Sequence, residues 1–246
     1  MPKNSLIMQT SSSEGNITTS STTALNNRSF QKEDSVQLLS QGAEEINKEL
    51  YEAAERGDST GVQSALSQGA NVNYQNPDEA TSLLVAAREG YHDIVQILLS
   101  EGADMNLRDI EGDTALIEAA RGGNCDIVEL LLKKGADPLH SNDGGATSLH
   151  DAAREGYHDV VQILLSARAD VNLRDIAGDT ALIAAARGGN CDVVELLLKK
   201  GADPSHSNNY GNTALIVAAE EGHYDIVQLL LNNGADQSTA NYVSIM

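Results

Sequence analysis

Residues 114–146 read TALIEAARGGNCDIVELLLKKGADPLHSNDGGA, and the rest of the ordered chain can be understood from this segment. Its opening threonine recurs every 33 residues, as Thr81, Thr114, Thr147, Thr180 and Thr213. Further along each unit comes an apolar run, in order IVQILL, IVELLL, VVQILL, VVELLL and IVQLLL. Self-similarity at a fixed period of this length indicates structural units that stack on one another.

The unit at 114–146 reads as two short helices and a loop. We expect the hydroxyl of Thr114 to cap a first helix, which Gly122-Gly123 ends. A second helix with a wide apolar face is predicted over 124–134. Gly135 supplies the left-handed residue that closes this helix, and a loop leads to the next unit. Neither helix can bury its apolar face alone, so neighbouring units must stack.

The threonine-led segments resemble the opening of ankyrin repeats, whose period is 33 residues and whose pattern is T-P-L-H-x-A. The segments here are TSLLVAA, TALIEAA, TSLHDAA, TALIAAA and TALIVAA. Proline is absent from all five, and only His150 stands at the usual histidine position. The resemblance covers 48–246 and implies an all-α repeat solenoid of stacked ankyrin-type helix-turn-helix units joined by hairpin-like loops. The repeats it predicts are 48–80, 81–113, 114–146, 147–179, 180–212 and 213–246.

The two ends of the chain differ from the repeats. Residues 1–43 are rich in Ser, Thr and Asn, and we expect a disordered leader because they cannot bury enough apolar surface to offset the entropy of ordering. The predicted repeat domain covers 44–246. Its last repeat shows little of the polar outer face that usually closes such an array, which leaves open a fraying end, a fragment of a longer array, or a partner that covers it.

A block of two neighbouring repeats occurs twice in the chain. Residues 81–146 and 147–212 differ at only 13 of 66 positions. One difference bears on stability: Arg168 replaces the glycine that closes the second helix in the other units, at 69, 102, 135, 201 and 234. We expect a positive φ at Arg168, which would cost on the order of 1 kcal/mol.

The composition narrows the possible partners. The formal net charge is -20, and residues 44–246 carry all of the excess, with 13 basic and 33 acidic side chains. Such a surface repels phosphate backbones and anionic membranes, so nucleic acid is excluded as an expected partner. Without a signal-peptide or membrane-spanning stretch, we expect no membrane insertion and an intracellular, cytoplasmic protein, with a nuclear or exported-effector location as the alternatives.

A row of arginines is the first candidate binding feature. These residues follow the paired alanines of four consecutive units and are Arg88, Arg121, Arg154 and Arg187. One interpretation is a clamp for carboxylates of a partner, since the resemblance implies that this position faces the binding groove. The other is internal pairing with nearby carboxylates, namely Glu89, Glu155, Asp113 or Asp179.

The loop tips before each threonine are the second candidate. DIEGD (109–113) and DIAGD (175–179) place Ile110 and Ile176 two units apart, and NNYGN (208–212) presents Tyr210. Exposed Ile and Tyr on loops are plausible anchors for a partner. Asp113 and Asp179, the last residues of the first two tips, are grouped with them as candidate partner-binding residues. The alternative is that each isoleucine packs on the neighbouring loop.

These observations predict a binding protein without catalytic activity. Every residue of catalytic type is accounted for as a repeat position, and the histidines and cysteines lack a ligand spacing, so no metal, cofactor or small-molecule substrate is expected. The predicted function is a protein–protein interaction module or scaffold that binds a partner protein through the concave helix and loop-tip face. The alternative is a regulatory or targeting fragment of a larger protein, such as an enzyme, channel or secreted bacterial effector.

Overall fold

The computed structural model describes residue 37 and residues 40–236. The chain divides after Glu45 into two units, each of which is described by itself. Most of the predicted leader and residues 237–246 of the predicted last repeat lie outside the described residues. Residues 40–45 of the first unit are helical, and the predicted domain boundary at residue 44 stays a prediction. The second unit begins at Ile46 and holds the helix pairs and all of the candidate binding residues.

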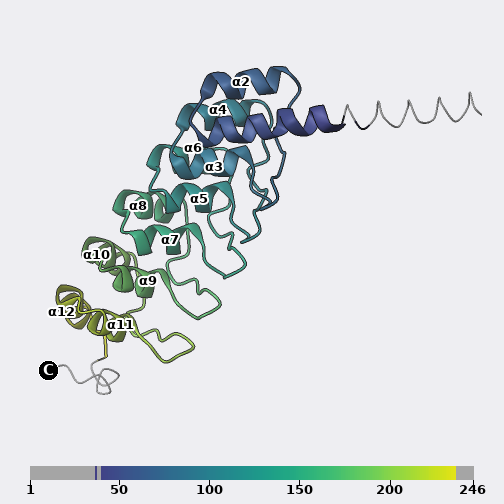
Figure 1. The fold of residues 1–246 in the computed structure, drawn as a ribbon. Coiled ribbons are helices and arrows are strands. Elements are labelled where there is room, and N and C mark those ends of the chain that lie inside the picture. Colours follow the sequence, from purple (N-terminus) through teal and green to yellow (C-terminus); the bar gives the residue numbers. More distant parts are fainter. Residues whose placement is uncertain (1–36, 38–39, 237–246) are drawn as a thin grey trace, which may run out of the picture. The chain divides into compact units, whose positions relative to one another are not determined.

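The described part of the second unit is built from helix pairs that succeed one another along a stack (Figure 1). The first helices of the pairs are residues 46–55, α3 (Ser82–Glu89), α5 (Ala115–Arg121), α7 (Ser148–Glu155), α9 (Ala181–Gly188) and α11 (Ala214–Glu220). The second helices are α2 (Ser59–Ser67), α4 (His92–Ser100), α6 (Cys125–Lys133), α8 (His158–Ser166), α10 (Cys191–Lys199) and α12 (Tyr224–Asn232). First helices pack on first helices and second helices on second helices, which makes two layers.

The core lies between and within these layers. The paired alanines of α3, α5, α7 and α9 are fully buried, as Ala119 and Ala120 of α5 show. Their small side chains let the next first helix approach closely. The second helices α4, α6, α8 and α10 each bury an apolar stripe of three residues, in α6 Ile127, Val128 and Leu131. The same positions are filled in each internal repeat, which produces one continuous core along the stack.

The threonines before the first helices all adopt extended backbone at the N-cap position, but their hydroxyls differ. Thr81 and Thr213 accept hydrogen bonds from Leu84 N–H and Ile216 N–H, both at 3.3 Å. The expectation for Thr114 was wrong, because its side chain makes no such capping bond although its φ of -97° and ψ of 168° match the others. The helix α5 therefore begins after an extended residue whose hydroxyl does not cap it.

The second helices close on left-handed residues, as predicted. Gly135 has a φ of 100° and Gly201 a φ of 92°. Arg168 occupies the same position with a φ of 69°, which confirms the predicted positive φ. After this residue the chain leaves the helix layers and forms a loop that returns to the next threonine.

The loops narrow to isolated antiparallel bridges next to the threonines. The bridged pairs are Gln75 with Thr81, Ser141 with Thr147, Arg174 with Thr180, and Ser207 with Thr213. These contacts make four of the loops hairpin-like, as expected, and place their tips between the bridged residues. The loop that leads to Thr114 and carries Ile110 is described in full and forms no such bridge. The first helices of the pairs are called the inner helices below. Together with the loop tips they form the face on which the candidate residues lie.

Candidate functional site

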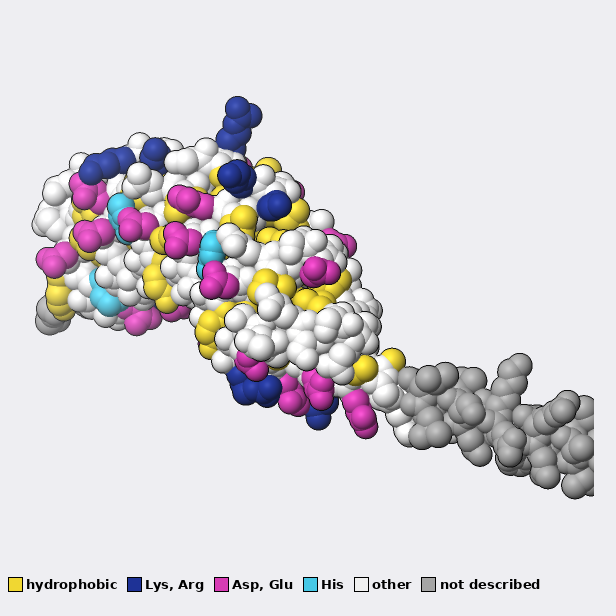
Figure 2. Space-filling view, turned by 90° about the horizontal axis from the view of Figure 1, so that it is seen from above, with side chains coloured by type: hydrophobic (Ala, Val, Ile, Leu, Met, Phe, Trp, Pro, Cys, Tyr) yellow, Lys and Arg dark blue, Asp and Glu magenta, His cyan; other side chains and the backbone are white. Residues whose placement is uncertain are grey.

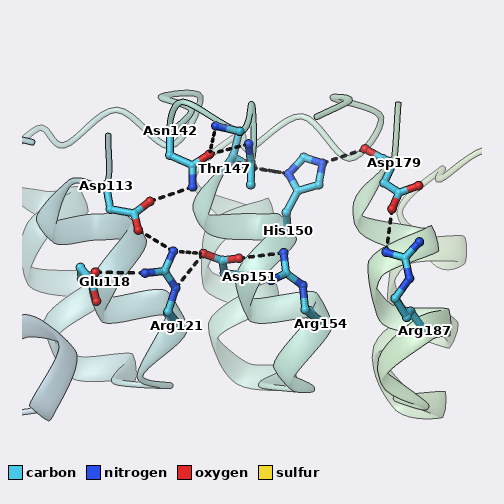
Figure 3. A network of polar contacts seen from close by, with 12 residues as sticks. Asp113, Glu118, Arg121, Asn142, Thr147, His150, Asp151, Arg154, Asp179 and Arg187 are labelled. Carbon is cyan, nitrogen blue, oxygen red and sulfur yellow. Dashed lines mark hydrogen bonds and ion pairs between the residues drawn. The ribbon is translucent and has the colours of Figure 1, made fainter. Parts of the chain in front are cut away.

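The four arginines of the predicted row stand at the ends of successive inner helices. Each makes an ion pair within the chain, and their side chains are between 31% and 48% exposed. Arg88 pairs with Glu89 at the end of its own helix, at 3.2 Å. The other three are drawn in Figure 3. The internal pairing considered from the sequence is present, and the clamp for carboxylates of a partner stays a prediction.

Arg121 is the centre of the polar network (Figure 3). Its Nη2 lies 2.6 Å from Oδ2 of Asp113 and 2.9 Å from Oδ2 of Asp151, and its Nη1 lies 3.0 Å from Oε1 of Glu118. These three carboxylates are almost fully buried. Burial disfavours the charge of Arg121, but the carboxylates outweigh it and raise the pKa of the guanidinium. Its donors therefore join α5, α7 and the preceding loop.

Arg154 and Arg187 each pair with one buried carboxylate. Arg154 Nη2 lies 3.1 Å from Oδ1 of Asp151, so its partner is Asp151 and not the Glu155 considered from the sequence. Arg187 Nη1 donates to Oδ2 of Asp179 at 2.6 Å. Asp151 thus bridges Arg121 of one repeat and Arg154 of the next, which ties two inner helices together.

Asp113 and Asp179 also connect successive loops. The Asp113 Oδ1 atom accepts from Asn142 Nδ2 at 2.8 Å, and the Asp179 Oδ1 atom accepts from Asn208 Nδ2 at 2.7 Å. Both aspartates were grouped with the binding residues from the sequence, yet they are only 0% and 5% exposed. Their geometry is that of groups that position arginines and loops.

The sequence analysis did not identify Glu118 and Asp151 as members of this network, although the repeat alignment marks both positions as unusual. The corresponding positions in neighbouring repeats carry Val85, Ala184 and Val217, so an acidic residue there enters a helix face that is otherwise apolar. Burial raises the pKa of Glu118 to about 7, with Arg121 acting in the opposite sense and Asp113 adding to the rise. The Glu118 carboxyl group therefore changes its charge near neutral pH.

Glu118 also belongs to the one group of possible metal ligands found among the described residues. One oxygen each from Asp109, Asp113 and Glu118 lies within 4.8 Å of the others. Arg121 already supplies a cationic partner to two of these three carboxylates. A metal ion at this place would therefore lie next to a guanidinium, which disfavours it.

His150 connects the start of α7 to the following loop. Its Nδ1 accepts from the backbone N–H of Thr147 at 3.1 Å, and its Nε2 lies 3.2 Å from the carbonyl oxygen of Asp179. These contacts fit a neutral ring that carries its proton on Nε2. Burial lowers the pKa of His150, which keeps the ring in this form.

The loop tips carry the largest exposed apolar side chains of this face. Ile110 is 58% exposed, Ile176 is 69% exposed and Tyr210 is 78% exposed. The alternative that each isoleucine packs on a neighbouring loop does not describe these side chains. With inner helices spaced roughly 8–10 Å apart, Ile110 and Ile176 lie roughly 16–20 Å from each other.

The backbones of the tips are held in a ladder of hydrogen bonds. Each tip donates an N–H to a carbonyl of the preceding tip: Ile110 to Asp78, Asp143 to Glu111, Ile176 to Gly144 and Asn209 to Ala177. Their lengths lie between 2.9 and 3.1 Å. The tips are thereby fixed relative to one another while their apolar side chains point into solvent.

The comparison with protein families agrees with this geometry. A model of ankyrin repeats, in 3 copies, matches residues 50–143 and 149–241. The chain belongs to the ankyrin repeat family. Ankyrin repeats are generally protein–protein interaction modules and are typically not catalytic. No curated protein matched the chain.

The surface of the ankyrin domain is predominantly acidic. Figure 2 shows acidic side chains spread over the face seen from above, whereas Lys and Arg lie mainly toward its edges. Among the described residues, no helix is long and apolar enough to cross a membrane.

Proposed function

We propose that this ankyrin domain binds a partner protein through its inner-helix and loop-tip face, with Ile110, Ile176 and Tyr210 as the principal anchors. The observation that carries the proposal is that these three side chains are more than half exposed on tips whose backbones are hydrogen-bonded to one another. Large apolar groups on a fixed backbone lose little conformational entropy when a partner covers them. Tyrosine in particular is enriched among residues that dominate binding.

The arginine row has a secondary role in this proposal. Arg88 and Arg154 are 48% and 47% exposed and can offer their outer edges to a partner, whereas Arg121 is only 31% exposed and bonded to three carboxylates. Asp113 and Asp179 position Arg121 and Arg187 and do not reach the partner. Because the domain is acidic, its partner carries basic or neutral surroundings, and added salt weakens the complex.

The test compares a bait altered at the loop tips with a control bait altered at an exposed tyrosine of the second-helix layer. The tip bait carries Ile110→Ser, Ile176→Ser and Tyr210→Ser. The control bait carries Tyr224→Ser, which removes a 70% exposed tyrosine from α12 of the second-helix layer. Proteins captured from lysate of the source cells by the wild-type chain are identified, and the affinity of the purified partner is measured by calorimetry.

We expect the tip bait to lose at least roughly tenfold in affinity, since truncating an anchor residue costs about 2 kcal/mol or more. The control bait binds as the wild-type chain does. Equal binding by wild-type and tip baits would overturn the role of the tips. A loss of affinity seen only with a bait that carries Arg88→Ala and Arg154→Ala would show that the arginine row, and not the tips, anchors the partner.

A further inference from the structure

The loop tip that presents Ile110 stands on a cluster of three carboxyl groups. Asp109, Asp113 and Glu118 place one oxygen each within 4.8 Å of one another. Asp113 is 0% exposed and Glu118 is 4% exposed. The Oε1 atom of Glu118 faces Arg121, whereas its buried Oε2 atom has no hydrogen-bond partner among the described residues. This arrangement leaves one buried oxygen that a proton can occupy.

The groups around Glu118 come from every element packed on α5. The preceding loop contributes Asp109 and Asp113, α5 itself contributes Arg121, α3 contributes Arg88, and α7 contributes Asp151 beyond Arg121. The charge of Glu118 also contributes to the raised pKa of Tyr51 in the first helix. The charged residues of α6, which are Asp126, Glu129 and Lys133, are exposed and point to solvent. Burial is the main reason that the pKa of Glu118 rises to about 7, so its charge changes in the physiological range.

Asp109 builds the tip itself. Its Oδ1 atom accepts from Glu111 N–H at 3.0 Å and from Asp113 N–H at 2.9 Å, and its backbone accepts from Gly112 N–H at 2.9 Å. Ile110 lies inside this turn. A change in the position of the Asp109 carboxylate therefore changes the turn that presents Ile110.

We propose that Glu118 is a proton-operated regulator of the Ile110 tip. Protonated, Glu118 is neutral and lets Asp109 and Asp113 remain close, so the tip turn is closed. Ionised, it adds a third negative charge to the cluster, repels Asp109 and loosens the turn. The consequence for binding rests on the proposed function, because it requires Ile110 to be an anchor.

The duplicated repeat provides a matched control within the same chain. The tip of Ile176 has the same framework, with Asp175 and Asp179 in place of Asp109 and Asp113. The position of Glu118 is taken by Ala184, and the Asp179 carboxylate is satisfied by Arg187 and Asn208. The Ile176 tip therefore lacks the third carboxyl group, and its turn stays closed over the same pH range.

The test follows the two tips directly, without any partner. The full chain is labelled at the δ1 methyl groups of isoleucine, and the methyl shifts of Ile110 and Ile176 are recorded by NMR from about pH 5.5 to about pH 8.5. We expect the Ile110 methyl to titrate with a midpoint near the pKa of Glu118, about 7. In Glu118→Gln, which keeps the shape of the side chain, that transition disappears.

Two histidines lie in neighbouring loops, and the same variant controls for their effects on the methyl shifts. His206 Nε2 lies 2.9 Å from the carbonyl oxygen of Gly178, beside the Ile176 tip, and His140 occupies the equivalent position one block earlier. Both remain in Glu118→Gln. Only the part of the Ile110 transition that this substitution removes is assigned to Glu118.

A second variant introduces the carboxyl group of Glu118 at the equivalent position of the Ile176 tip. Ala184→Glu supplies the missing carboxyl group to the second tip, and we expect the Ile176 methyl to gain a transition near neutral pH. An Ile110 transition that persists unchanged in Glu118→Gln would overturn the proposal. So would an Ile110 transition that calcium or magnesium chloride abolishes at constant ionic strength, because the cluster would then hold a cation. A normal titration together with tip variants that bind their partner as the wild-type chain does would refute the proposed function alone.

Discussion

Arg168 stands at a position where the other described repeats carry glycine, and its φ of 69° is a conformation that residues with a Cβ atom rarely adopt. The matching glycines have φ between 87° and 100°, and a Cβ atom built on them meets nothing within 4 Å. Steric contact with neighbours is therefore not the reason for glycine. The requirement is conformational and belongs to a single residue.

Arg168→Gly should stabilise the domain by about 1 kcal/mol, because glycine adopts the left-handed region without the cost that a side chain brings. The free energy of unfolding from urea titration measures the change. Gly201→Arg is the control at the same position of the next repeat and should destabilise by a similar amount. If Arg168→Gly has no effect or lowers stability, contacts of the arginine outweigh its backbone strain.

At the scale of one element, α7 shows how a repeat departs from its neighbours. Its third and fourth residues after the cap are His150 and Asp151, where the aligned helix α3 has Leu84 and Val85. Both polar residues are 2% exposed, and both find partners outside their own helix. The helix tolerates them because the next loop supplies the carbonyl oxygen of Asp179 and the previous helix supplies Arg121.

His150 makes the stability of this element depend on pH. Its pKa is lowered in the folded state, so the unfolded chain binds a proton more readily. The stabilising contribution is present above the unfolded pKa of about 6.5 and is lost as the pH falls below it, by up to about 1.4 kcal/mol per pH unit. Glu118, with a raised pKa, acts in the opposite sense, so a matched variant is needed to separate the two.

His150→Ile is that variant, since Ile117 and Ile183 occupy the same position in neighbouring repeats. We expect the wild-type chain to lose more free energy of unfolding than His150→Ile between about pH 7.5 and about pH 5.5. Urea titrations at both pH values, with Glu118 left intact in both proteins, give the difference. Identical losses would mean that His150 does not titrate in this range.

At the scale of the whole domain, the fold and the proposed binding face are separable. The core runs between the helix layers, whereas the tips lie outside these layers, in four loops beyond a bridge that closes the loop. Side chains at the tips can therefore vary without disturbing the stack. The duplicated block shows this pattern, because Asp143, Gly144 and Ala146 become Asn209, Tyr210 and Asn212 in its second copy.

Ile176→Ser and Ile183→Ser test this separation on the two sides of one repeat boundary. Ile176 is 69% exposed and Ile183 is 1% exposed. We expect Ile176→Ser to change the free energy of unfolding by less than roughly 0.5 kcal/mol, and Ile183→Ser to lower it by more than about 2 kcal/mol. Thermal and urea unfolding measure both. A large loss from Ile176→Ser would show that the tip supports the stack.

The sequence by itself determined the repeat, its 33-residue period, the helix pairs and the left-handed Arg168. These follow from local patterns, since caps, glycines and apolar stripes act within a few residues of one another. The tertiary structure decided which charges meet: Arg121 and Asp151 are 30 residues apart and come together only when two repeats stack. It also decided that Asp113 is buried and that Glu118 titrates near neutral pH, because burial depends on what the next repeat covers.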